Sequence, residues 1–170
     1  KSAVRWIRAN AKKLGVDPKR VAAGGGSAGG HVAAATGNLP ELEEEGEDLT
    51  VSSKPDALVL FNPVYDNGPK GYGHSRVADR YKEISPFHNL RKGAPPTITF
   101  LGDQDKLIPV STAEAYKKKM EDAGSRSELR VYEGQPHGFF NEGKKGGYYQ
   151  KTVLEMDKFL LSLGWLKGKP

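Results

Sequence analysis

Apolar residues recur along this chain in two alternating patterns. Short continuous apolar runs are typical of buried strands, and they alternate with segments whose apolar residues recur every three or four positions, as in amphipathic helices. The runs predict strands over residues 20–23, 56–64, 96–101 and 129–132. The longer period predicts helices over residues 4–14, 28–36, 111–123 and 153–163. We therefore expect an α/β fold with a mostly parallel sheet of about four strands and helices on its faces.

Length and composition suit a single folding unit. The chain has 170 residues, of which 36% are hydrophobic, and we expect one domain spanning residues 1–170. No apolar run approaches the length of a membrane span, and no signal peptide is visible, because residues 1–6 already have the pattern of a helix interior. The sequence does not indicate a compartment. With no cysteine, disulfides, thiolate catalysis and cysteine zinc sites are excluded.

Two local signals refine the helix predictions. Ser111 and Glu114 form a capping box that predicts a helix start, and Gly124 ends the same helix. Residues 67–91 are irregular, with Ser85-Pro86 as the start of a short helix.

The net charge is +5, and the lysines and arginines form small clusters that are far apart in the sequence. Their clusters lie on a predicted helix, in a loop and at the C-terminus, whereas nucleic-acid binding needs one basic face with interleaved aromatic residues. We predict no nucleic-acid partner. The acidic segment 41–48 is interrupted by Leu42 and Gly46, so we interpret it as a solvated loop and expect no metal site there.

The segment Gly25-Gly26-Ser27-Ala28-Gly29 reads G-x-S-x-G and lies between a predicted strand and a predicted helix. In that context the motif indicates a nucleophile elbow. A serine hydroxyl is a weak nucleophile near neutral pH and needs an adjacent base. We expect the glycines to tolerate positive φ angles and to permit close approach of other backbone.

Polar residues also follow the later strands. Asp105 follows the third strand and His137 follows the fourth, so both belong to the same edge of a parallel sheet as Ser27. The chain order Ser, Asp, His is that of α/β-hydrolase triads. Asp103 competes for the acid role, and His31, one helical turn after Ser27, is an alternative base. We interpret His31 as a packing or hydrogen-bonding residue, since helical side chains lean toward the preceding turn.

Three segments together resemble the motif blocks of α/β-hydrolase esterases, above all the hormone-sensitive-lipase-like and acetyl-esterase-like carboxylesterases. The segments are Gly24-Gly25-Gly26-Ser27-Ala28-Gly29-Gly30-His31, Gly102-Asp103-Gln104-Asp105-Lys106-Leu107-Ile108-Pro109 and Pro136-His137-Gly138-Phe139. The resemblance implies Ser27 as nucleophile, His137 as general base and acid, and Asp105 as the group that orients His137. It also implies the backbone N–H of Ala28 as an oxyanion-hole donor. Five residues after strand ends are candidates for the substrate pocket, with core packing as the alternative for the aromatic one: Asn62, Val64, Leu107, Ile108 and Phe139.

The chain departs from these esterases at its start. It has no H-G-G-G-type loop upstream of the elbow, which in the family supplies the second oxyanion donor, and no counterpart of the strands that precede the elbow strand. The sequence therefore looks like the C-terminal half of a catalytic domain. Its first strand is expected to be an exposed apolar edge, stabilised by an N-terminal partner fragment or by self-association.

These features predict a serine hydrolase that cleaves short-chain carboxylic esters through an acyl-enzyme, with no cofactor or metal. Three alternatives stay open: a carbohydrate acetyl esterase, a prolyl-oligopeptidase-like serine peptidase, and a catalytically incomplete half that acts as a binding or assembly module.

Overall fold

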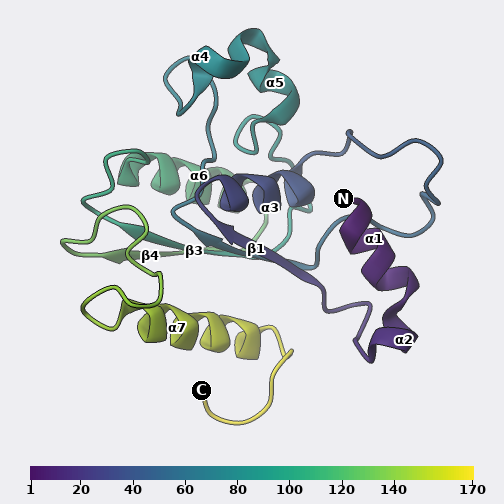
Figure 1. The fold of residues 1–170 in the computed structure, drawn as a ribbon. Coiled ribbons are helices and arrows are strands. Elements are labelled where there is room, and N and C mark those ends of the chain that lie inside the picture. Colours follow the sequence, from purple (N-terminus) through teal and green to yellow (C-terminus); the bar gives the residue numbers. More distant parts are fainter.

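Four strands pair in chain order into one sheet in the computed structural model, which describes residues 1–170 (Figure 1). The strands are β1 (Ala22–Gly26), β2 (Ala57–Phe61), β3 (Thr97–Gly102) and β4 (Ser127–Tyr132). Every neighbouring pair is parallel, so the expected parallel sheet is confirmed. Since each strand runs in the same direction, the loops that follow all four strands lie at one edge of the sheet.

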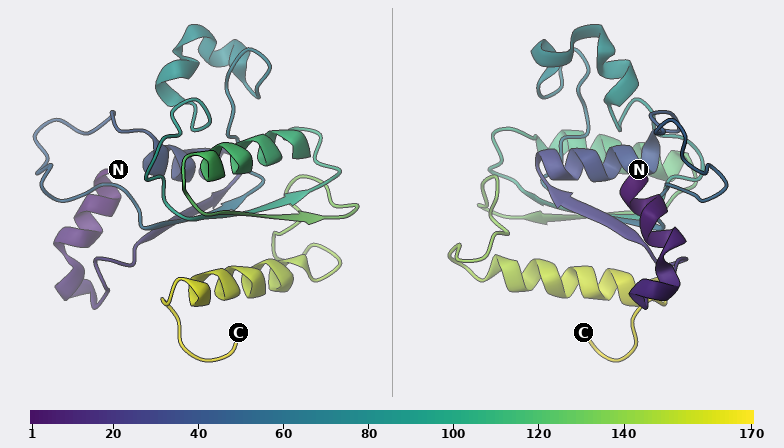
Figure 2. Two further views of the ribbon diagram at one scale, coloured as in Figure 1. Left: turned by 180° about the vertical axis from the view of Figure 1, so that it is seen from behind. Right: turned by 45° about the vertical axis from the view of Figure 1, so that its right-hand side comes forward.

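Helices cover both faces of this sheet. Figures 1 and 2 show α3 (Ala28–Asn38) and α6 (Val110–Asp122) on one face and α7 (Tyr148–Ser162) on the other. The short helices α1 (Ser2–Ala9) and α2 (Ala11–Leu14) lie beside the β1 end of the sheet. A small helical projection rises above α3 and α6, made of α4 (His74–Val77), the 3-10 turn η1 (Ala78–Arg80) and α5 (Tyr81–Ile84).

The sheet divides the hydrophobic core into two clusters, because alternate side chains of a strand point to opposite faces. The larger cluster of 12 residues packs the sheet against α3 and α6, and fully buried Leu58 and Leu60 supply the β2 part of it. The smaller cluster lies between the sheet and α7, where Val59 and Phe100 contact Phe159 and Phe139. The sheet is thus buried on both faces, which explains the continuous apolar run of β2.

Most predicted elements have somewhat different bounds in the structure, and two of the differences have a local cause. The predicted helix over residues 4–14 is interrupted at Asn10 (φ −104°, ψ 13°) and forms α1 and α2, with Gly15 ending α2 in the left-handed conformation at φ 69°. The first strand begins later than predicted and continues through Gly24 to Gly26. Backbone pairing with β2 sets this end, since each of these glycines has a partner in the parallel register.

Two local predictions were wrong. Helix α6 begins at Val110 with Pro109 as its N-cap and has no side-chain cap, so Ser111 lies inside the helix and forms no capping box. Ser85-Pro86 does not begin a helix, because α5 ends at Ile84 and Ser85 is extended (ψ 117°). Proline disfavours the helical conformation in the residue before it, and Ser85 is held further by its hydroxyl, which donates to the Tyr65 carbonyl at 3.1 Å.

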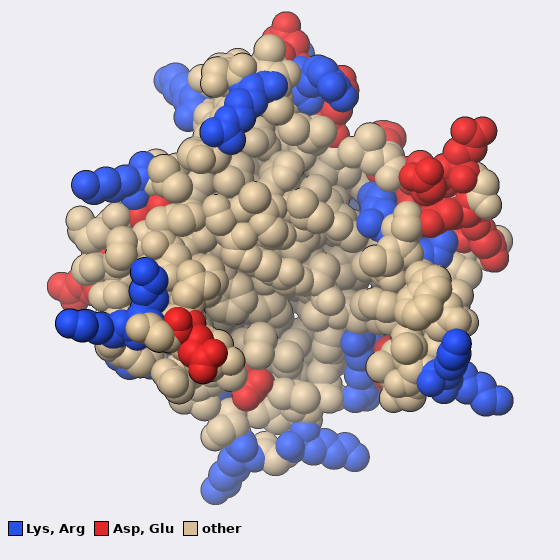
Figure 3. Space-filling view, viewed as in Figure 1, with Lys and Arg blue, Asp and Glu red and all other residues tan.

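Charged side chains are dispersed around the outline of the molecule in the view of Figure 3. Lysines and arginines project separately there, and acidic residues gather at one side, over the loop that contains segment 41–48. This face of the molecule shows no continuous basic surface. No helix is both long enough and apolar enough to cross a membrane.

Candidate active site

Ser27 occupies the sharp turn between β1 and α3. Its backbone has φ 53° and ψ −115°, a conformation that side-chain-bearing residues rarely adopt. Two backbone hydrogen bonds of Ser27 hold the turn. The Ser27 N–H donates to the Phe61 carbonyl of β2 at 2.9 Å, and the Ser27 carbonyl accepts from the His31 N–H of α3 at 3.0 Å. The positive φ that we expected at the glycines is therefore carried by the serine itself.

The glycines of the elbow provide space. A Cβ atom on Gly25 would lie 2.6 Å from the Gly29 carbonyl carbon, and one on Gly30 would lie 2.7 Å from the Pro63 Cβ. The end of β1 and the start of α3 pack backbone against backbone at this point. This contact confirms the expectation that the glycines permit other backbone to approach closely.

Three side chains from separate strand ends form one hydrogen-bonded chain. The Oγ atom of Ser27 lies 3.0 Å from Nε2 of His137, and Nδ1 of His137 lies 2.6 Å from Oδ2 of Asp105. The Asp105 side chain is fully buried, whereas the His137 side chain is 25% exposed. The structure thus brings together the serine, histidine and aspartate that the sequence singled out, with the imidazole on the solvent side.

The loop after β3 holds the Asp105 carboxylate in place. Oδ1 accepts hydrogen bonds from the backbone N–H groups of Leu107 at 2.8 Å and Ile108 at 3.0 Å, which leaves Oδ2 for the imidazole. Because Oδ2 accepts from Nδ1–H, the Nε2 atom of the neutral imidazole keeps its lone pair toward Ser27. Asp103 instead accepts from the Gly134 N–H at 2.7 Å and braces the turn after β4.

The other histidines lie away from the serine hydroxyl. Nε2 of His31 lies 3.1 Å from the carbonyl oxygen of Ile84, so His31 connects α3 to the end of α5. Burial lowers the pKa of His31, although hydrogen bonds to Ile84 and Asn67 oppose this effect. His74 contacts the Asn67 carbonyl, and His88 contacts Ser85 Oγ. This geometry supports the packing interpretation of His31.

The backbone N–H of Ala28 is available to a ligand. Ala28 is the first residue of α3, where N–H groups have no acceptor within the helix, and no other atom of the chain accepts from it. The residue is exposed. Its N–H therefore offers a donor at a helix N-terminus, which favours negative charge.

The five candidate pocket residues lie in three different surroundings. Leu107 and Ile108 line a cavity of about 170 Å³ together with Tyr65 and Tyr72. Val64 and Phe139 are 6% and 2% exposed and belong to the two core clusters, so packing accounts for them.

The fifth candidate, Asn62, is completely buried and contacts His137. Its place after a strand end was visible in the sequence, but its contact was not.

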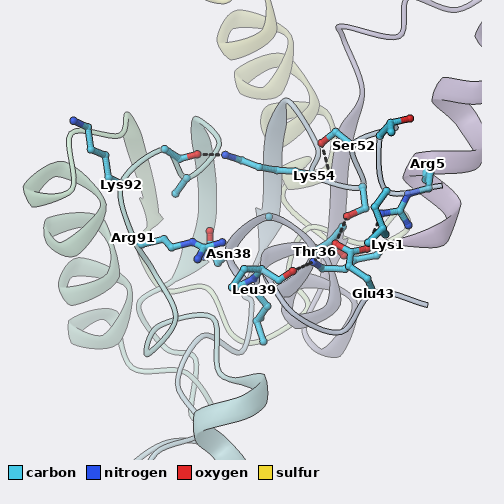
Figure 4. A pocket seen from close by; sticks show the side chains of 17 residues that line it. Lys1, Arg5, Thr36, Asn38, Leu39, Glu43, Ser52, Lys54, Arg91 and Lys92 are labelled. Atoms are coloured by element: carbon cyan, nitrogen blue, oxygen red, sulfur yellow. Dashed lines mark hydrogen bonds and ion pairs between the residues drawn. The ribbon is translucent and has the colours of Figure 1, made fainter. Parts of the chain in front are cut away.

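A larger cavity of about 390 Å³ lies at the far end of α3, away from the hydrogen-bonded chain, and is shown in Figure 4. Its walls carry several cations, but Lys1 and Arg5 each bind the Glu43 carboxylate at 2.8 Å. Burial raises the pKa of Glu43, but hydrogen bonds from Lys1, Arg5 and Ser53 outweigh it and lower the value to about 2. We interpret this ion-pair network as a structural connection between α1 and the loop before β2.

The chain is similar to a known protein family and to solved structures over nearly its whole length. The model of the prolyl oligopeptidase family matches residues 2–162. A structure of Thermogutta terrifontis esterase 2 phosphoramylated by tabun superimposes with a TM-score of 0.92 at 44% identity and covers 99% of this chain and 64% of that one. The propionate-bound structure of the same esterase gives a TM-score of 0.88 at 42% identity, covering 99% of this chain and 65% of that one.

Two curated relatives are also ester hydrolases by name. Esterase LipC of Mycobacterium tuberculosis is 32% identical over 82% of this chain and 40% of its own length. The acetylxylan esterase of Xylanibacter ruminicola is 26% identical over 94% of this chain and 34% of its own length. The chain thus spans about two fifths or less of these curated relatives and under two thirds of the Thermogutta chain.

These comparisons confirm the resemblance to α/β-hydrolase esterases and the α/β-hydrolase fold. The fold of this chain superimposes on that of the Thermogutta esterase over 99% of this chain. The match of the family model over residues 2–162 establishes that the chain belongs to the prolyl oligopeptidase family.

Proposed function

We propose that this chain carries the catalytic triad of a serine carboxylesterase that cleaves short-chain acyl esters. The observation that supports it best is the hydrogen-bonded sequence from Ser27 Oγ through His137 to Asp105, at 3.0 and 2.6 Å. A base within hydrogen-bonding reach of the hydroxyl, itself oriented by a carboxylate, is the arrangement that activates a serine.

In the proposed reaction, Ser27 Oγ attacks the ester carbonyl carbon while His137 Nε2 accepts the hydroxyl proton. The tetrahedral intermediate places its oxyanion at the Ala28 N–H, and it collapses when Nε2–H protonates the departing alkoxide. Water, deprotonated by Nε2, then attacks the acyl-enzyme, and the carboxylic acid leaves as Ser27 regains its proton. Asp105 remains ionised throughout and keeps the imidazole in the required tautomer.

The substrate class rests on two observations. Leu107 and Ile108, whose N–H groups hold the Asp105 carboxylate, line a cavity of about 170 Å³, which we assign to a small group of the substrate. The Thermogutta esterase has been observed with propionate and with butyrate bound, and both are short carboxylates. We therefore infer short acyl esters as substrates of this chain.

Replacement of the nucleophile tests the proposal. Ser27→Ala removes the attacking oxygen, so turnover of p-nitrophenyl acetate should fall by at least about 10³-fold in any active form of the protein. Ser111→Ala, which removes an exposed serine inside α6, is the matched control and should retain the activity. Turnover by Ser27→Ala near the level of the control would refute the assignment.

A fluorophosphonate probe separates the esterase from a catalytically incomplete module. We expect one covalent adduct on Ser27 and none in Ser27→Ala. The probe reacts directly with an activated serine, so labelling does not depend on ester turnover. An unlabelled Ser27 in the folded protein would favour the binding or assembly module instead.

Two other substrates deserve comparison because specific relatives point to them. The acetylxylan esterase suggests acetylated carbohydrates, and the family description suggests peptides. Measurement of kcat/KM for p-nitrophenyl butyrate, acetylated xylo-oligosaccharides and a prolyl peptide amide would show which of the three substrate classes is cleaved most efficiently. We expect the simple ester to be cleaved fastest, and faster cleavage of the peptide would overturn the esterase assignment.

A further inference from the structure

Asn62 lies beside Nε2 of the His137 imidazole and is not exposed to solvent at all. It is the first residue after β2, one strand away from the elbow. Its side-chain amide makes two contacts with the loop after β4. Oδ1 accepts from the Gly138 N–H at 2.8 Å, and Nδ2 lies 3.3 Å from Nε2 of His137.

The first contact determines the orientation of the amide. A backbone N–H can only donate, so the atom that faces Gly138 has to be the oxygen, and the amide nitrogen is turned to His137. Nε2 of His137 is therefore bounded by two partners, the Ser27 hydroxyl at 3.0 Å and the Asn62 amide at 3.3 Å. A rotation of the imidazole about its bond to Cβ would break both contacts.

The backbone of Asn62 is held in an unusual conformation. Its φ is 34°, in a region that costs residues with a side chain about 1–3 kcal/mol. Its N–H donates to the Phe100 carbonyl of β3 at 2.7 Å, and Pro63 follows and packs against Gly30 of α3. Strand pairing and helix packing thus fix the residue from both sides, which makes its side chain a rigid support.

We propose that Asn62 is a positioning residue for the triad, which holds His137 Nε2 in line with Ser27 Oγ. This inference rests on the proposed function and extends it, because neither the pocket prediction nor the resemblance gave Asn62 this role. The Gly138 contact fixes the loop, and the Nδ2 contact fixes the ring. Because Asn62 is fully buried, it acts through His137 and does not touch the substrate.

Two substitutions separate the two contacts. Asn62→Leu removes both, whereas Asn62→Asp keeps an oxygen for Gly138 N–H and replaces the N–H that faces Nε2 with a carboxylate oxygen. We expect kcat for p-nitrophenyl acetate to fall by about 10²-fold in Asn62→Leu, because misplacement of a reacting group by about 1 Å has that effect. Asn62→Asp should lose at least about tenfold. In both variants KM should stay within about twofold of the wild type, since binding is untouched.

Asn67→Asp is the matched control. Asn67 is another buried asparagine of the same connection, but its amide contacts Tyr72 and its backbone contacts Ser85, and neither reaches His137. It should change stability without changing kcat. An Asn62→Asp variant with the kcat of the wild type, or a rise of KM at constant kcat, would overturn the proposal.

A measurement without turnover distinguishes this inference from the proposed function. The ¹⁵N resonance of His137 Nε2 reports the Asn62 contact in the folded chain whether or not esters are cleaved. We expect it to move in Asn62→Leu and Asn62→Asp and to stay in Asn67→Asp. An unchanged resonance in both Asn62 variants would refute the contact, while failure of wild-type labelling by a fluorophosphonate would refute only the esterase assignment.

Discussion

At the scale of single residues, the site depends on where side chains are absent as much as on where they are present. Ser27, with a φ of 53°, lies in a turn where neighbouring backbone segments approach closely. Gly25 faces the Gly29 backbone, whereas a Cβ on Gly29 itself would have no atom within 4 Å. The two outer glycines of the motif therefore differ in how strongly the fold requires them.

This difference gives a prediction for two matched variants. Gly25→Ala would place a Cβ atom 2.6 Å from the Gly29 backbone. We therefore expect the free energy of unfolding to fall by about 1–3 kcal/mol. Gly29→Ala lies in the first turn of α3 with open space, and alanine is the better helix former by up to about 1 kcal/mol. Thermal unfolding of both variants checks this. Equal melting temperatures would contradict the packing account of the elbow.

At the scale of elements, ion pairs connect segments that the hydrophobic clusters leave out. Neither core cluster contains a residue of α1. Lys1 and Arg5 of this N-terminal segment instead bind Glu43 at 2.8 Å, and Arg5 also donates to the Val51 carbonyl at 2.8 Å. The position of α1 therefore depends on a carboxylate that has to stay ionised.

Acidification should weaken that connection. Since the pKa of Glu43 falls from 4.5 to about 2 on folding, its contribution is complete above pH 4.5 and is lost as the pH falls toward 2. Solvent-accessible pairs contribute about 1 kcal/mol or less each, so we expect a shift of a few degrees in Tm. Glu43→Gln should have the lower Tm at pH 6 and approach the wild type near pH 2. Glu44→Gln, at an exposed position, is the control and should follow the wild type at both pH values.

At the scale of the whole molecule, β1 is an open edge of the sheet. The Val21 carbonyl and the Ser27 N–H both bond toward β2, so the intervening backbone groups of Ala22, Gly24 and Gly26 face outward, as alternation along a strand requires. Unpaired strand edges associate with other chains. The chain also spans less than two thirds of the Thermogutta esterase that it resembles.

We therefore expect the 170-residue chain by itself to self-associate through β1. Size-exclusion chromatography with light scattering should give a mass above the 18.5 kDa of one chain. Ala22→Lys, which places a charge at an exposed position of the edge, should reduce the association. A wild-type chain that stays a soluble monomer at high concentration would contradict the expectation.

The sequence by itself determined the class of fold, and it singled out Ser27, Asp105 and His137 as the proposed triad. Apolar runs alternating with helical periods give a parallel sheet, and the carboxyl ends of its strands meet at one edge, so polar residues placed after those ends had to be neighbours. These are local signals, and the chain order of Ser27, Asp105 and His137 is read directly.

Tertiary structure alone decided what depends on contacts between distant segments. The orientation of the Asp105 carboxylate toward the imidazole follows from the Leu107 and Ile108 N–H groups, which bind its other oxygen. Helix α6 begins at Val110, directly after the extended Pro109, and the capping signal at Ser111 is not used. The contact of Asn62 with His137 joins residues 75 positions apart, and no local pattern records such a distance, because it is set by how the strands pair.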